Sequence, residues 1–168
     1  MAENILKVRL YGDPCLRKKC TTVVSVGASE RMLIKDMIET MYHHKGVGLA
    51  APQVGINEQI FVADIGEGPF AVINPRILKR KGTSSVEEGC LSIPGVLVEV
   101  KRPETIVVRY MDENNNMVER ECSELLARVI LHETDHLLGK LIVDYATWGQ
   151  KKKVTQQLQK FLNENKVS

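Results

Sequence analysis

The segment from Ser123 to Gly139 constrains the fold of this chain more than any other. Its apolar residues cover most of the circumference of a helix: Leu125, Leu126, Val129, Ile130, Leu131, Leu137 and Leu138. A helix that is apolar on nearly every side is buried inside the protein. Ser123 is a typical N-cap residue and Gly139 a typical stop signal. The rest of the chain is therefore expected to wrap around a central helix.

The flanking segments supply elements that can cover this helix. One helix is predicted over residues 29–46, with Gly46 as its C-cap and these apolar residues at helical spacing: Leu33, Ile34, Met37, Ile38 and Met41. A last amphipathic helix is predicted over residues 147–163, with an inner side formed by Val154, Leu158, Phe161 and Leu162. Runs rich in β-branched and aromatic residues predict strands at 59–65, 70–75, 95–100, 105–112 and 117–122, and a short one at 141–143.

The order of these elements is typical of an α+β protein. We expect small antiparallel or mixed β-sheets packed around the central helix, with one N-terminal and one C-terminal helix in addition. The asparagines at 114–116 predict a turn that joins the strands at 105–112 and 117–122 as a hairpin. Residues 1–168 are expected to form a single catalytic domain.

Composition excludes several classes of function. A net charge of +2, three Phe, four Tyr and one Trp give little basis for nucleic-acid recognition. No run approaches the ~18 apolar residues of a membrane helix, and the first residues do not resemble a signal peptide. We therefore expect a cytoplasmic protein with no membrane contact. Cys15, Cys20 and Cys122 are interpreted as free thiols, because a cytosolic chain of this size does not need disulfides.

The central helix also contains an unusual polar set. His132 and His136 stand four residues apart, with Glu133 between them, in the pattern H-E-x-x-H. This spacing places both imidazoles on one helix face, where they can share a metal ion. Without partners, the burial of these three groups would cost several kcal/mol. A catalytic metal site of this kind normally has three protein ligands, so a third one is required.

Several candidates for the third ligand are unconvincing. One protease pattern requires a histidine where Ile142 stands, and Glu164, the one glutamate after the motif, is expected on a solvated helix face. Asp135 points elsewhere on the helix, and Asp144 is better placed for a salt bridge. Cys122 could complete a structural site, but about 15 Å of helix rise separates it from His132.

The remaining candidate is Cys90, within EEGCLSIPG at residues 87–95. A thiolate with two imidazoles and one open position suits Zn²⁺, Fe²⁺, Co²⁺ or Ni²⁺. A buried thiol with no ligand role is the alternative interpretation. A metalloprotease, a structural metal module and an inactive peptide-binding protein remain the competing functions.

Three stretches in order, GVGLAAPQ at 46–53, EGCLS at 88–92 and HETDH at 132–136, resemble the motifs of the peptide deformylases. RLYGDPCLR, RPETIVVRYMD and LLARVILHETDHLLGKLIVD are similar to that family as well, so the resemblance covers nearly the whole chain. It implies the bacterial type with a helical C-terminus. Leu131 and Leu138 depart from the residues common in the family, but neither is a metal ligand position.

The resemblance implies a function and a role for each site residue. The family hydrolyses the N-formyl group from the formylmethionine of nascent bacterial proteins and releases formate. Cys90, His132 and His136 would bind the metal, with Fe²⁺ as the physiological ion and Zn²⁺, Ni²⁺ or Co²⁺ in purified protein. Glu133 would act as general base and then general acid. The Gln53 side chain and the Leu91 backbone N–H would stabilise the negative charge on the formyl oxygen.

Substrate contacts are expected around these residues. Gly46 and Gly48 allow a loop to pass close to the substrate, and a methionine pocket is predicted from Val47, Leu125 and Val129. The peptide beyond methionine is expected to pair with a strand edge near Glu88, which could instead or also support the metal site. The QKKK run at 150–153 is typical of a solvated face, but in the family that this chain resembles the helical tail can face the ribosome, so the resemblance implies a ribosome contact of the last helix.

Overall fold

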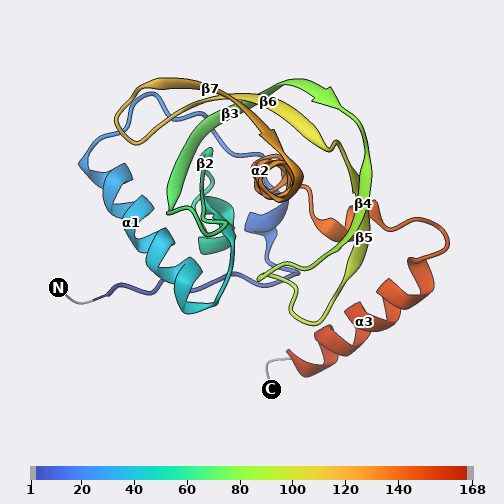
Figure 1. Ribbon diagram of the computed structural model, residues 1–168. Helices are drawn as coiled ribbons and strands as arrows, with labels where there is room; N and C mark the ends of the chain where they lie inside the picture. Colours follow the sequence, from blue (N-terminus) through green and yellow to red (C-terminus); the bar gives the residue numbers. More distant parts are fainter. Residues whose placement is uncertain (1–2, 166–168) are drawn as a thin grey trace.

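The central helix predicted from the sequence is the centre of the fold. The computed structural model describes residues 3–165, and the predicted domain limits, 1 and 168, lie outside the described residues. Helix α2, Glu124–Leu137, is seen end-on in Figure 1 with strands on several sides of it. Ala127, Ile130 and Leu137 are buried, and Ser123 is the N-cap residue. The α+β architecture is therefore confirmed.

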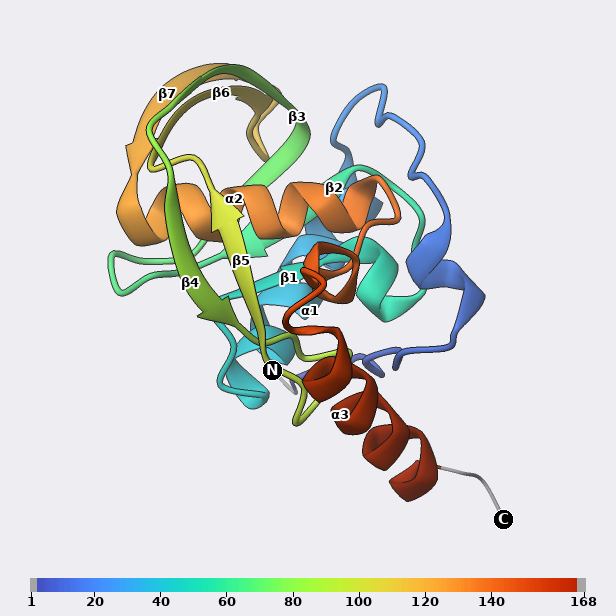
Figure 2. The same ribbon diagram turned by 90° about the vertical axis from the view of Figure 1, so that its right-hand side faces the viewer.

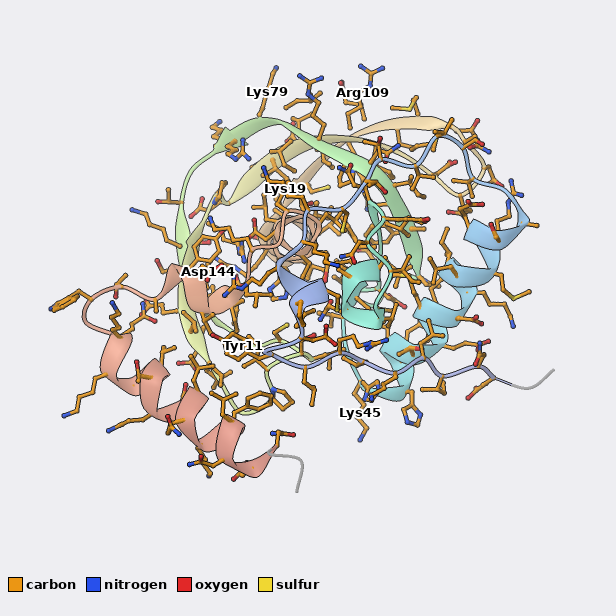
Figure 3. All side chains as sticks on the ribbon, turned by 180° about the vertical axis from the view of Figure 1, so that it is seen from behind. Tyr11, Lys19, Lys45, Lys79, Arg109 and Asp144 are labelled. Carbon is orange, nitrogen blue, oxygen red and sulfur yellow. The ribbon has the colours of Figure 1, made fainter. Side chains whose placement is uncertain are left out.

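An antiparallel sheet curves over one side of α2. Within residues 3–165 it has five strands in the order β1-β2-β3-β6-β7. The strands are β1 Gly48–Ala50, β2 Ile60–Ala63, β3 Phe70–Lys81, β6 Thr105–Met111 and β7 Met117–Ser123. Two register shifts in β3 bend it. The inner residues of the five-stranded sheet pack on α2, while Lys79 and Arg109 point away from the molecule in Figure 3.

A second sheet lies on another side of α2. It consists of β4, Ser84–Glu88, and β5, Val98–Arg102, paired antiparallel. Figure 2 shows this pair in front of α2. In the part of the chain that is described, β4 pairs with β5 alone, so its other edge is open. The sequence did not predict β1 or β4, because both are short and neither alternates clearly between apolar and polar residues.

Helix α1, Ala28–His43, packs its buried methionines, Met37 and Met41, against the five-stranded sheet. The prediction that Gly46 caps this helix was wrong. Lys45 has the left-handed conformation, with a φ of 56°, and the Gly46 N–H donates to the Met41 carbonyl. This is the hydrogen bond of a Schellman cap, with a lysine where glycine is usual. Gly46 serves a different purpose, described below.

The C-terminal part differs from the predictions in detail. Ile142–Tyr145 forms a 3-10 turn, η3, where a strand was predicted, because Asp144 folds back to accept from the Leu141 N–H. Asp144 also pairs with Arg17, as expected. Helix α3, Lys151–Glu164, lies at the periphery beside β5 (Figures 1 and 2), and it buries Val154 and Phe161. Leu162 is 41% exposed, so its assignment to the inner side was wrong.

The prediction that α2 is buried on all its apolar positions holds for the middle of the helix and fails at its ends. Leu125 and Leu138 are each 53% exposed: Leu125 lines a cleft, and Leu138 is the C-cap residue after the last helical position. The four cysteines have no disulfide among the described residues, as predicted. Across residues 3–165 no helix has the length and apolar character needed to cross a membrane.

Candidate metal centre and active site

The three predicted ligands lie together although they come from two parts of the fold. Helix α2 presents His132 and His136 from successive turns, and the loop after β4 presents Cys90. Their ligand atoms all lie within 4.8 Å of one another, and the Cys90 Sγ is 3.4 Å from the His136 Nε2. Around a tetrahedral ion with sulfur at about 2.3 Å and nitrogen at about 2.0 Å, such donors stand roughly 3.5 Å apart. The residues therefore fit a divalent metal ion.

The other candidate ligands lie elsewhere. Asp144 pairs with Arg17, and Asp135 accepts from Arg102. Cys122 is buried in the core under the five-stranded sheet. In residues 3–165, the one group of histidine, cysteine and acidic side chains close enough to hold a metal is the Cys90, His132 and His136 set.

Glu133 is a buried acidic group beside this ligand set. Its Oε1 is 3.9 Å from the His132 Nε2, and its buried Oε2 has no hydrogen-bond partner among the described residues. Burial raises the pKa of Glu133 to about 7, against the opposing effect of the nearby positive charges. A carboxyl group with that pKa exchanges protons readily near neutral pH.

Glu88 orients one of the metal ligands. Its Oε1 is 3.0 Å from the His132 Nδ1, and its two oxygens also accept from Arg102 at 2.6 and 2.9 Å and from Arg128 at 2.5 Å. Burial alone would raise the pKa of Glu88, but the hydrogen bonds from Arg102 and His132 hold it at about 2. The ionised carboxylate keeps the proton of His132 on Nδ1, which leaves Nε2 free to ligate.

The two imidazoles differ in their electrostatic surroundings. Burial lowers the pKa of His136 well below its usual value, and His132 lowers it further, so that the ring is neutral. Burial also acts to lower the pKa of His132, but Cys90 and Glu88 outweigh it and raise that pKa. A cation at this site competes with the extra proton of His132 and favours the neutral form that ligates.

Gln53 belongs to the 3-10 turn Ala51–Val54, which follows β1. Its side chain is 1% exposed, and its Oε1 accepts from the Ala50 N–H at 2.9 Å. This contact directs the amide NH₂ toward the Ser92 Oγ at 3.1 Å and the Cys90 Sγ at 3.6 Å. The donor group of Gln53 thus lies beside the ligand cysteine.

Two glycines of the first motif allow close packing at the site. A Cβ atom at Gly48 would stand 3.0 Å from the Cγ and Cδ atoms of Glu133. One at Gly46 would stand 2.9 Å from a methyl carbon of Leu91. Both distances are shorter than an ordinary contact, so a side chain at either position would displace Leu91 or Glu133, and glycine serves close approach here and not a left-handed backbone.

A cleft of about 450 Å³ opens above these residues. Every predicted site residue except His136 lines it: Gly46, Val47, Gly48, Gln53, Glu88, Cys90, Leu91, Leu125, Val129, His132 and Glu133. Sequence reasoning missed Lys45, Val86 and Arg128. Arg128 stands one helical turn before His132, a spacing that could have indicated it. Lys45 and Val86 had no comparable signal.

The fold and the site define a class of protein: a metal-dependent enzyme with one cysteine and two histidine ligands, and an acidic group on the ligand helix. The family model described as "Polypeptide deformylase" matches residues 5–152. A peptide deformylase of Clostridium botulinum (strain Alaska E43 / Type E3) is 52% identical over 140 residues, which cover 83% of this chain and 95% of that protein.

Two solved structures of similar proteins agree with this match. The crystal structure of peptide deformylase from Thermotoga maritima has a TM-score of 0.84 and 48% identity, and the match covers 85% of this chain and 98% of that one. A peptide deformylase from Legionella pneumophila has a TM-score of 0.89 and 37% identity, over 97% and 99% of the two chains. This chain belongs to the polypeptide deformylase family, and its activity is that of a metal-binding hydrolase, a peptide deformylase.

Proposed function

We propose that the chain removes the formyl group from the N-terminal formylmethionine of newly synthesised proteins and releases formate, with Glu133 as the group that moves the proton. The observation that carries this proposal is the pairing of a metal ligand set with a buried carboxyl group that has a free oxygen and a pKa of about 7. The motifs and the family membership supply the identity of the substrate.

Cys90, His132 and His136 would hold the metal ion. When bound there, a divalent cation would lower the pKa of a water molecule to about 7 and polarise the formyl oxygen. We infer Fe²⁺ as the physiological ion from the family resemblance. The thiolate and imidazole donors suit Zn²⁺, Ni²⁺ or Co²⁺ as well.

Glu133 would take a proton from the attacking water at its free carboxylate oxygen. The same oxygen would then give a proton to the nitrogen of the departing amine, so one residue serves as general base and general acid. Its side chain is buried against Gly48, which restricts its orientation.

The negative charge that develops on the formyl oxygen needs hydrogen-bond donors that are already in place. We assign this role to the amide NH₂ of Gln53 and to the backbone N–H of Leu91. The contact between Ala50 and the Gln53 Oε1 supports the assignment, because it turns the NH₂ group toward Cys90. The backbone of Leu91 follows directly after the ligand cysteine.

The peptide would bind along the open edge of β4, with backbone hydrogen bonds that do not read its sequence. Exposed apolar side chains at the cleft support a pocket for methionine: Val47 is 48% and Leu125 is 53% exposed, and Val129 lies one helical turn deeper. Glu88 itself is buried under Arg102 and Arg128, so we assign it to the support of His132.

A cytoplasmic bacterial enzyme of this kind would meet its substrates at the ribosome. Helix α3 starts with Lys151, Lys152 and Lys153, all exposed, and Trp148 in front of it is 88% exposed. We propose that this helix contacts the ribosome. If deletion of the residues after Gly149 leaves ribosome co-sedimentation unchanged, with the fold intact by circular dichroism, this part of the proposal is wrong.

The principal test is formate release from formyl-Met-Ala-Ser by protein purified without oxygen. We expect Glu133→Ala to lose this activity while it still binds one metal ion per chain. Glu113→Ala, which removes an exposed acidic residue from the turn between β6 and β7, is the matched control and should be fully active. Absence of formate with metal bound, in both Fe²⁺ and Ni²⁺ forms of the unaltered protein, would refute the proposed function.

A further inference from the structure

The hydrogen bonds that orient His132 extend well beyond Glu88. The Nη1 of Arg102 donates to the Asp135 Oδ2 at 2.9 Å, and the Tyr145 hydroxyl donates to the same oxygen at 2.6 Å. Arg102 in turn binds Glu88, which accepts from His132. A continuous path of hydrogen bonds therefore leads from the turn η3, which precedes α3, to a metal ligand.

This path is restrained at its centre. Arg102 is 4% exposed and uses Nε and Nη2 on Glu88 and Nη1 on Asp135. A guanidinium is planar and its donors have fixed directions, so a rotation that moves one contact moves the others. The ring of Tyr145 also lies 4.9 Å from the Arg102 Cζ. Both the ring and the hydroxyl of Tyr145 thus act on the same guanidinium.

We propose that Tyr145 is a positioning residue of the metal site. By fixing Asp135 and Arg102, it sets the direction of the Glu88 carboxylate and through it the ring orientation of His132. The turn that leads to the C-terminal helix thereby contributes to metal binding. The proposal rests on the metal site of the proposed function and not on which reaction that site catalyses.

A simpler explanation is that Tyr145 only anchors the turn η3. The same turn has a second anchor, Asp144, which is labelled in Figure 3. Asp144 accepts from Arg17 at 2.6 and 3.1 Å and from the Leu141 N–H at 3.0 Å. Asp144→Asn therefore loosens the turn without a direct contact to Arg102, and it is the matched control for Tyr145→Phe.

The test compares Co²⁺ binding by the full-length unaltered protein, Tyr145→Phe and Asp144→Asn. Dissociation constants come from competition with a chelator, and the visible absorption spectrum of the Co²⁺ form reports the geometry of the ligands. Partners of metal-ligating histidines typically change affinity by about 10- to 100-fold, and Tyr145 acts three contacts beyond Glu88, through Asp135 and Arg102. We expect Tyr145→Phe to weaken Co²⁺ binding about 3- to 10-fold and to shift the spectrum, with an unchanged KM and a lower kcat.

Asp144→Asn should keep the Co²⁺ affinity and spectrum of the unaltered protein. Equal effects of the two substitutions, or no effect of Tyr145→Phe, would overturn the proposal. If Tyr145→Phe unfolds at the assay temperature, Asp135→Ala removes the oxygen that accepts from both Tyr145 and Arg102, and unchanged Co²⁺ binding in that variant would overturn the proposal. Because no formyl peptide is used in the titration, its outcome is independent of the formate assay.

Discussion

Replacement of Glu88 by glutamine tests the buried ion cluster directly. Glu88 is 7% exposed and accepts from two arginines and His132, and its pKa is about 2 instead of the ordinary 4.5. A carboxylate stabilised to that extent contributes about 3 kcal/mol to the free energy of unfolding at neutral pH. Removing one partner of a buried ion pair costs about 3–5 kcal/mol, in agreement with that magnitude. We therefore expect Glu88→Gln to lose about 3 kcal/mol at pH 7.

The dependence of this loss on pH follows from the sign of the shift. Because folding lowers the pKa of Glu88, its contribution is fully present above pH 4.5 and disappears as the pH falls through about 2. The difference in stability between the unaltered protein and Glu88→Gln should therefore shrink to about half by pH 3. The effect of the lost ion pairs is thus distinguished from a simple packing defect, which would not depend on pH.

The assay is urea unfolding of the metal-free proteins, followed by far-ultraviolet circular dichroism. Tryptophan fluorescence is a poor probe, because the single tryptophan, Trp148, is 88% exposed. Glu87→Gln is the control: this neighbour on β4 is exposed, and its loss should cost less than about 0.5 kcal/mol. A loss below about 1 kcal/mol for Glu88→Gln, or a loss that stays constant down to pH 3, would refute the reasoning.

Three further predictions concern other parts of the molecule. Burial raises the pKa of Glu133 from its ordinary 4.5 to about 7, so the folded metal-free protein loses stability as the pH rises from about 4.5 to 7, and the loss is complete above 7. Glu133→Gln should therefore be more stable than the unaltered protein at pH 8, by about 3 kcal/mol in urea unfolding, and equally stable at pH 4. Gly48→Ala places a Cβ against Glu133 and should lower kcat by about 100-fold in the formate assay, whereas Gly149→Ala, which has open space, should be neutral. Phe161→Ala should cost about 3–5 kcal/mol in the same unfolding assay if α3 unfolds together with the rest, and Leu162→Ala less than about 1 kcal/mol.

Much of the architecture follows from local sequence patterns. The apolar circumference of α2 predicted a central helix, and the period of the strand segments predicted most of the sheet. The spacing of His132 and His136 places them on one face of any helix, so two of the three metal ligands depend on geometry within a single element. The hairpin of β6 and β7 was also predicted from a local pattern, because its turn residues are adjacent in the sequence.

Other features were decided by contacts between distant segments. The exposure of Leu125 depends on the cleft that it lines, and the conformation of residues 142–145 depends on Arg17, more than 120 residues away. Strand β4 is too short to be recognised without β5 beside it. Periodicity reports which face of an element is apolar, but it does not report what lies opposite that face.

In the candidate site, too, some features follow from local sequence patterns and others from contacts between distant segments. The sequence by itself determined the reactive groups, since the imidazole pair, Glu133 and a thiol in a separate motif already indicated metal chemistry. Only the tertiary structure decided that Glu88 contacts His132 and is connected through Arg102 and Asp135 to Tyr145, because Glu88, Arg102 and Tyr145 come from β4, β5 and a turn after α2. Their mutual orientation is a property of packing between elements, and such packing is set by buried contacts that no local sequence pattern encodes.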